Sequence, residues 1–365
     1  MIDSWNHEVG YVIVDDTTET VEETLDDTVE EVPADTIDLD NYVMPEQIAT
    51  SGSLIERFLS TAFHCQYEDV TDEQKTAITD FYVTYKGGSS NEYRITYSVR
   101  DSRDYTFTLS NVTGDSAYSK LPELTGLRQL SIEDENVKNI SFLDGMDSVE
   151  ELTLDVDPFA YDIFSGQLDE VEKLELTSLD GADTLDLLYG FPNVTNLRLG
   201  FESSKYYTGD LSPILALEHV NHLSLMGFQN VYFDITPVFT RDYEFINLCK
   251  CYFAFDPDKL VENDTLTSLY LDDVYMLTNV TTEVSGTQTT VNYSKGRVGE
   301  YDGFFLNFPN LTTLSVLSCE LKDVSDIGQL TKLEHLDLRD NYITDSSPLD
   351  NLPAIQDISL SGNAL

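Results

Sequence analysis

The feature that most constrains this chain is an internal repeat of about 22 residues that fills its second part. From Leu124 onward, apolar residues recur at positions 1, 4, 7 and 9 of a unit that returns every 22 to 26 residues, with one interval of 45. The units start at Leu124, Met146, Leu168, Phe191, Leu217, Thr240, Asn263, Phe308, Leu330 and Leu352. Such periodicity predicts stacked repeats. The long interval corresponds either to two units or to one unit with an insertion.

The spacing within a unit predicts a strand and its orientation. Positions 7 and 9 are two residues apart, so on a strand both side chains point to the same side, and we predict that they face the core. Positions 6, 8 and 10 then point outward onto the concave face of a curved parallel sheet. Strands lie about 4.8 Å apart, so ten or eleven strands form a face roughly 45–50 Å long. We therefore predict an α/β repeat solenoid with a docking surface of standard interface size.

The clearest copy of the repeat carries Leu330, Leu333, Leu336 and Leu338, with an asparagine at position 12, Asn341. The pattern resembles the 22-residue leucine-rich repeat of bacterial internalin-type surface proteins, over residues 124–365 and a helical cap at 52–85. This resemblance implies a leucine-rich-repeat horseshoe that binds other proteins. Position 12 departs from the family's asparagine in most units, where it is occupied by residues such as Asp157, Glu202, Phe228 and Val274.

The sequence divides into three predicted regions. Residues 1–51 form an acidic flexible linker, because residues 1–50 contain 15 Asp or Glu and no Lys or Arg, a composition that buries too little apolar area to fold; a contribution of its Val and Ile residues to a strand is the alternative. Residues 52–120 form an N-terminal cap with a helix and a β-hairpin, and Thr71 with Gln74 indicates a helix start. Residues 121–365 form the solenoid, with an inserted hairpin at about 274–307 that turns at Ser285 and Gly286.

The charge and the cysteines exclude several classes of function. A net charge of −47, from 67 acidic against 20 basic residues, repels phosphate backbones, so we expect no nucleic-acid partner and no binding to anionic membranes. No apolar stretch is long enough to insert into a membrane. The four cysteines lack zinc-site spacing, and Cys251 and Cys319 fall at position 12, where we predict buried spacers. No phosphate loop or nucleophile motif occurs, so we expect neither a cofactor nor an enzyme.

The candidate binding residues are the outward positions of the middle units. In the early units these positions are polar, as in Gln129, Ser131 and Glu133. In the middle units they carry Met, aromatic and Arg residues, which are enriched at interface hot spots. The predicted site consists of Arg198, His222, Met226, Phe245, Asn247, Tyr270, Asp272 and Leu317. Two alternatives are that loop 201–216 or the hairpin covers this patch, or that the pattern is scatter without meaning.

Two functions compete at this stage. The first is an extracellular or cell-surface adhesion and recognition module that acts through the concave face and the inserted loops. Its partner is a protein, or alternatively a glycan. The start of the sequence has no signal-peptide pattern, so this function presumes that a signal or lipid anchor precedes the chain. The second is a cytosolic scaffold or regulatory subunit. An upstream signal peptide or lipid-attachment motif in the gene would favour the first.

The predicted linker can be tested by truncation. We expect removal of residues 1–50 to leave the melting temperature of the protein nearly unchanged, because the segment has no periodic apolar face. Calorimetry of the full and shortened chains would measure this. A fall of more than a few degrees would show that the segment packs on the solenoid.

Overall fold

The computed structural model describes residues 52–100, 104–112, 117–162, 164–179, 182, 184–201, 210–285 and 288–365. The predicted linker at 1–51 and the tip of loop 201–216, at residues 202–209, lie outside these ranges. Among the described residues, no helix combines the length and apolar character needed to cross a membrane.

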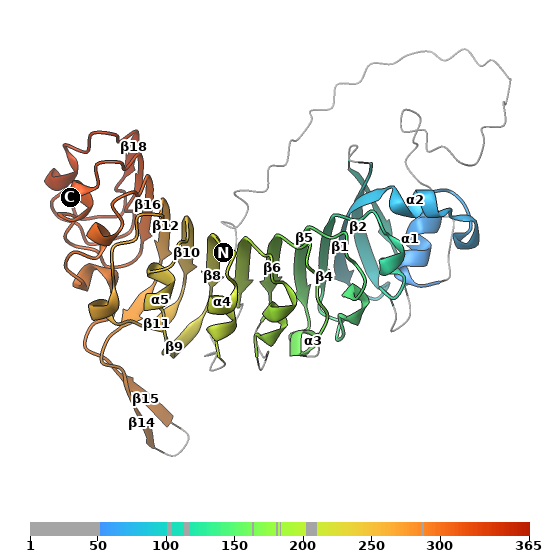
Figure 1. Ribbon diagram of the computed structural model, residues 1–365, viewed down its shortest axis with the longest axis horizontal. Coiled ribbons are helices and arrows are strands. Elements are labelled where there is room, and N and C mark those ends of the chain that lie inside the picture. The colour runs from blue at the N-terminus through green and yellow to red at the C-terminus, as the bar shows by residue number, and fades with distance from the viewer. Residues whose placement is uncertain are drawn as a thin grey trace, which may run out of the picture. The chain divides into compact units, whose positions relative to one another are not determined.

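A single large sheet organises the solenoid (Figure 1). Ten of its strands come from the ten repeat units and pair in parallel with neighbouring units. They are β4 (Gln129–Asp134), β5 (Glu151–Val156), β6 (Lys173–Thr177), β7 (Asn196–Gly200), β8 (His222–Met226), β10 (Phe245–Cys249), β12 (Ser268–Asp272), β16 (Thr313–Leu317), β17 (His335–Asp337) and β18 (Asp357–Ser359). The predicted fold is confirmed: this part of the chain is a leucine-rich-repeat solenoid.

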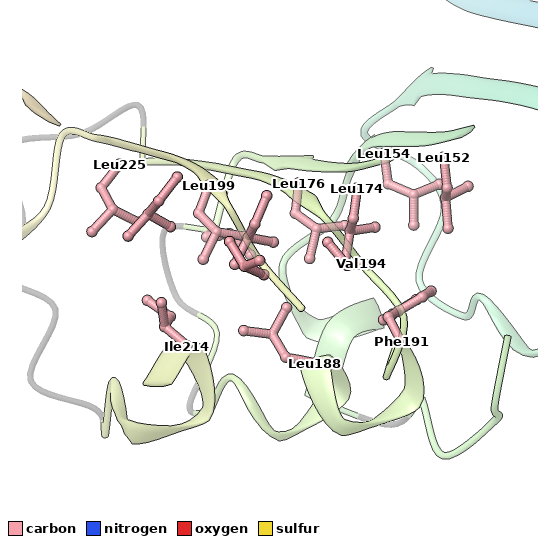
Figure 2. Close-up of a cluster of buried hydrophobic side chains, with 14 of the residues drawn as sticks. Leu152, Leu154, Leu174, Leu176, Leu188, Phe191, Val194, Leu199, Ile214 and Leu225 are labelled. Atoms are coloured by element: carbon pink, nitrogen blue, oxygen red, sulfur yellow. The ribbon is translucent and has the colours of Figure 1, made fainter. Parts of the chain in front are cut away.

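The register places equivalent repeat positions beside one another. Leu152 pairs with Leu174, and Leu154 pairs with Leu176, so positions 7 and 9 form continuous rows of buried leucine. Figure 2 shows these residues beside Leu199 of the next unit, with Leu188 and other apolar side chains beneath them. All of these side chains are buried. The predicted assignment of inward and outward positions is therefore confirmed.

Short helical segments follow the repeat strands from β4 to β17, and one more precedes β4. The α-helices in the solenoid are α3 (Phe159–Asp162), α4 (Ser212–Ala216) and α5 (Thr236–Phe239). The other segments are 3-10 turns at Leu121–Glu123, Ser141–Leu143, Asp186–Gly190, Pro257–Lys259, Val298–Glu300, Phe305–Asn307, Ile327–Gln329 and Ser347–Leu349. These segments contribute buried residues such as Leu143, Leu188 and Ile214 to the core, so the leucine rows are covered on the side away from the outward positions.

The N-terminal cap has the predicted helices, and its strands join the large sheet. Helix α1 (Leu54–Ala62) begins with a capping box formed by Ser53 and Glu56, and α2 (Asp72–Thr76) begins with the predicted pair of Thr71 and Gln74; a 3-10 turn (Tyr67–Asp69) lies between them. Strand β1 (Ile78–Gly87) pairs antiparallel with β2 (Glu92–Val99), which pairs with β3 (Tyr105–Leu109). Because β1 also pairs in parallel with β4, the cap covers the first edge of the repeat sheet rather than forming a separate hairpin.

The 45-residue interval holds one unit with an insertion. Strand β12 pairs directly with β16, residue for residue from Ser268 to Asp272, so no second repeat strand lies between them. The insertion contains β14 (Thr281–Ser285) and β15 (Gln288–Asn292), which pair antiparallel. These two strands form a hairpin, which Figure 1 shows as an arm that projects away from the large sheet. The predicted turn residue Gly286 lies outside the described ranges.

A second, three-stranded parallel sheet was missed by the sequence analysis. It consists of β9 (Gln229–Asp234), β11 (Tyr252–Ala254) and β13 (Tyr275–Leu277), in the order β13-β11-β9. These strands follow the turns after β8, β10 and β12, where the sequence is aromatic and position 12 lacks asparagine. The sheet hydrogen-bonds the backbone at position 12 in two of these units, since Tyr252 donates to Phe228 O at 2.7 Å and Tyr275 donates to Cys251 O at 2.8 Å.

The turn out of each strand has a fixed conformation. Position 11 has positive φ in seven units, at Ser178, Gly227, Lys250, Asp273, Ser318, Asp340 and Gly362. Only glycine fits at Gly227, because the Cβ of any other residue would lie 2.2 Å from the carbonyl oxygen of Phe201. At position 12 of the ninth unit, the buried Asn341 amide accepts from the N–H groups of Cys319 and Leu321 at 3.1 and 3.0 Å and donates to Val316 O at 2.6 Å. Asn341 therefore ties consecutive turns together.

The two other position-12 residues singled out from the sequence are buried as predicted. Cys251 and Cys319 are fully buried free thiols. The thiol of Cys251 lies 3.3 Å from Leu225 O, and that of Cys319 lies 3.6 Å from Leu271 O. Each thiol thus contacts a backbone carbonyl of an earlier unit, as Asn341 does, with a weaker donor.

The register can be tested in the ninth unit. Leu336→Ala should cost about 2–5 kcal/mol of unfolding free energy, the range for truncating a buried leucine, because Leu336 is buried in the row of position 7. Asp337→Ala, on the opposite face, should cost under about 1 kcal/mol. Urea denaturation of both variants measures the difference, and equal costs would contradict the register.

The turn-to-turn tie can be tested at Asn341. Asn341→Ala leaves buried backbone groups without partners, and we expect it to cost about 2 kcal/mol or more of unfolding free energy. The matched control is Asn193→Ala, whose exposed side chain donates one hydrogen bond to Asp169 O at 2.9 Å and should cost about 0.5 kcal/mol or less. Similar urea midpoints for the two variants would rule out a stabilising role for Asn341.

Candidate functional site

The open face of the large sheet is the surface formed by repeat positions 6, 8 and 10. Strand alternation places all eight predicted site residues on it: Arg198 on β7, His222 and Met226 on β8, Phe245 and Asn247 on β10, Tyr270 and Asp272 on β12, and Leu317 on β16. Their strands are consecutive in the sheet. The residues therefore lie together, but the register divides them into rows rather than one stripe.

Three rings lie side by side on three neighbouring strands, and we call them the aromatic ladder: His222, Phe245 and Tyr270. His222 and Phe245 are register partners, and Tyr270 is offset from Phe245 by two residues. The rings of His222 and Phe245 stack, with centroids 5.6 Å apart and planes inclined by 27°. The centroids of Phe245 and Tyr270 are 5.2 Å apart. The Nδ1 atom of His222 lies 2.7 Å from Asn221 Oδ1. Because each ring is held by its neighbours, the ladder presents a preformed apolar surface of limited side-chain freedom.

A second group occupies position 10 of four neighbouring strands, which we call the position-10 row: Met226, Cys249, Asp272 and Leu317. They are aligned by the register. The thiol of Cys249 donates to Asp272 Oδ2 at 3.5 Å, and burial, followed by the nearby Asp272 carboxylate, raises the pKa of the thiol to about 12. Burial also raises the pKa of Asp272. The row is therefore largely apolar, with one carboxylate in a weakly solvated position.

An acidic region borders this apolar centre on the side of the earlier repeats. Glu133 and Asp155 are register partners, and Glu175 lies on the next strand. Burial raises the pKa of Glu175; Arg198 lowers it, and the carboxylates of Asp155 and Glu133 raise it further. Arg198 Nε lies 3.2 Å from Glu175 Oε1, and its Nη2 lies 3.7 Å from Met226 Sδ. Arg198 thus joins the acidic region to the apolar centre.

The predicted exposure of the site residues needs correction. All eight are half-buried rather than exposed, and Cys249, also an outward position, is only 7% exposed. The cause is lateral contact between adjacent strands, as in the hydrogen bond of 3.0 Å from Asn247 Nδ2 to Ser224 Oγ. The hairpin does not explain this burial, because it projects away from the sheet (Figure 1), and residues 202–209 of the other proposed covering loop lie outside the described ranges.

The sequence analysis also missed the interaction that anchors the insertion, which we call the Arg297 clamp. The guanidinium of Arg297 lies 3.3 Å from the ring centroid of Tyr275, and that ring stacks on Tyr252 at 4.2 Å. Arg297 also pairs with Asp273 at 3.1 Å and Glu320 at 3.3 Å, although its side chain is only 11% exposed. Burial opposes the charge, but the hydrogen bond with Asp273 and the neighbouring anions raise the pKa of Arg297. The C-terminal leg of the insertion is thereby fixed to the turns of two repeats.

A family model and two solved structures are similar to parts of this chain. A family model described as leucine-rich repeats (2 copies) matches residues 309–351. No curated protein matches the chain. A crystal structure of an internalin (inlF) from Listeria monocytogenes is 16% identical over 80% of this chain and 76% of that one, with a TM-score of 0.36. An internalin C2 (inlC2) from the same organism is 19% identical over 67% of this chain and 65% of that one, with a TM-score of 0.21. The assignment as a leucine-rich-repeat solenoid therefore rests on the family match, the repeat register and the parallel sheet.

Proposed function

We propose that this protein is a recognition module that binds a protein partner through the open face of its solenoid. The observation that carries the proposal is the apolar centre formed by the aromatic ladder and the position-10 row. Aromatic, Met and Arg side chains are the types enriched at interface hot spots. A chain of charge −47 has ample acidic side chains for such positions, so half-buried rings on an outer face favour a docking role.

The charges on the open face define what kind of partner fits. An apolar partner group placed on Phe245 and Tyr270 would have Glu175 and Asp155 on one side and Asp272 on the other. Arg198 is already paired with Glu175. A complementary partner surface therefore presents an aliphatic or aromatic residue flanked by Lys or Arg, which the acidic chain would also attract at long range.

The setting that we propose is extracellular or cell-surface adhesion and recognition. The chemistry of the thiols is compatible with an oxidising environment: burial raises the pKa of Cys249 to about 12 and that of Cys319 to about 11. Cys251 is fully buried and its pKa is raised also. Because thiolates are the reactive species, these three residues are protected against oxidation.

The proposal is tested by capture followed by a double substitution. The full chain serves as bait on intact cells and, separately, in cytosolic extract, with cross-linking and mass spectrometry to identify the partner. Phe245→Ala combined with Tyr270→Ala should then weaken binding by about 2 kcal/mol or more in surface plasmon resonance. The melting temperature should change little, because both side chains lie outside the leucine rows.

Tyr189→Ala combined with Tyr342→Ala is the matched control, since both rings are exposed and lie off the open face. This control should bind like the wild type. Equal affinity of the two double variants would exclude the open face as the site, and a partner found only in the cytosolic extract would exclude the surface role.

A further inference from the structure

A groove of about 770 Å³ lies on the insertion side of the solenoid, away from the aromatic ladder. It is formed where the strands of the three-stranded sheet end, near Asp234, Asp256 and Thr278, and where the two legs of the insertion pass, near Asn279 and Ser294. Its volume falls in the range of small-molecule sites, roughly 300–1,000 Å³. The second sheet and the insertion create it together, since neither alone supplies both walls.

The polar wall of the groove is held in place before any ligand arrives. Asp234 accepts from the N–H and the hydroxyl of Thr236 at 3.0 and 2.5 Å. The Thr236 hydroxyl oxygen in turn accepts from Asp256 N–H at 2.9 Å. Lys259 bridges Asp234 at 3.3 Å and Asp256 at 2.8 Å, and its hydrogen bond lowers the pKa of Asp256. Both carboxylates are thus held in place by hydrogen bonds and ion pairs, with Lys259 beside them as a donor.

The groove also has an aromatic surface, supplied by the same strand as Asp234. Tyr232, on β9, lines the groove and is 59% exposed. Phe255 and Leu277 line the same groove and are buried. On the insertion legs, Asn279 donates to Ser294 Oγ at 3.2 Å, which fixes a further amide and a hydroxyl at the rim. The groove therefore combines an exposed ring with a set of fixed donors and acceptors.

These features discriminate among classes of ligand. Three aspartates line the groove against two lysines, Lys259 and Lys295, and this excess of negative charge disfavours an anion such as a phosphate. Within the described ranges, no group of three or more His, Cys, Asp or Glu is arranged to hold a metal ion, and a hydrocarbon would desolvate the ionised wall without compensation. A neutral polyhydroxyl ring suits the site: its hydroxyls both donate and accept, and its C–H face packs on an aromatic side chain.

We propose that this groove is a carbohydrate-binding site for a neutral oligosaccharide, with Tyr232 as the stacking platform and Asp256 and Lys259 as hydrogen-bonding groups. The site is separate from the protein-docking face, so an experiment can refute either proposal without affecting the other. A sugar bound here would contact both the solenoid and the insertion, which gives the Arg297 clamp a purpose beyond local stability: it fixes the leg that forms one wall.

The experiment is saturation-transfer NMR on the full chain with four neutral disaccharides (cellobiose, lactose, maltose and chitobiose) and one sulfated disaccharide. We expect transfer to at least one neutral sugar and none to the sulfated one. Tyr232→Ala and Asp256→Asn should each raise the Kd measured by titration about tenfold, which is the effect of losing one good contact. Tyr342→Ala is the matched control, because Tyr342 is 57% exposed and lies outside the groove, and it should leave Kd unchanged.

Three results would overturn the proposal: no transfer to any neutral disaccharide, an unchanged Kd in Tyr232→Ala, or preference for the sulfated sugar. Melting temperatures guard against unfolded variants, and Ser294→Ala, at an exposed rim position, provides a second substitution that does not touch the Asp256 network. The Phe245→Ala and Tyr270→Ala double variant should bind the disaccharide with wild-type Kd, which separates a failure of the groove from a failure of the open face.

Discussion

The structure depends on one constraint: a single repeat cannot bury its own leucines. The two leucines of a strand, such as Leu174 and Leu176, are shielded only when the neighbouring units supply Leu152, Leu154, Leu197 and Leu199 in the same register. Parallel pairing satisfies the backbone hydrogen bonds of the strands and buries their apolar side chains at the same time. Each added unit extends both the hydrogen-bonded sheet and the buried rows. The cap follows the same rule, because β1 pairs with β4, the first repeat strand, which would otherwise lack a partner at that edge.

The turn after each strand is where the units differ, and these differences create the functional surfaces. In the ninth unit a buried asparagine, Asn341, satisfies the backbone of consecutive turns. In the middle units Phe228, Cys251 and Val274 take its position, and the strands β9, β11 and β13 form ladder hydrogen bonds there. The carboxyl ends of these strands lie together, and side chains and the insertion can line a groove there. In these three units the second sheet, rather than an asparagine, pairs the backbone of the turns, and its strands border the groove.

The two candidate surfaces differ in physical character because of where they lie. The open face is a regular sheet surface whose strands are close enough for outward side chains to pack on one another, so its rings and the carboxylates of Glu175 and Asp272 are half-buried. The groove at the insertion is irregular and contains ion pairs such as Lys259 with Asp256. Lateral packing on the first surface suits a rigid protein contact, whereas fixed donors and acceptors beside Tyr232 suit a small polar ligand.

The sequence by itself determined the repeat, the fold and the facing of the strand residues, because a period of two within a strand and about 22 between strands leaves one register that aligns the apolar residues of positions 7 and 9 in the core. It also indicated the capping pair Thr71 and Gln74 and the hairpin, since both depend on local contacts. Only the tertiary structure decided how far Phe245 or Cys249 is buried, whether the 45-residue interval held one repeat or two, and that Arg297 reaches Asp273 and Glu320. Those outcomes depend on contacts between residues about 20 or more positions apart, and no periodicity in the sequence records which irregular turn lies against which.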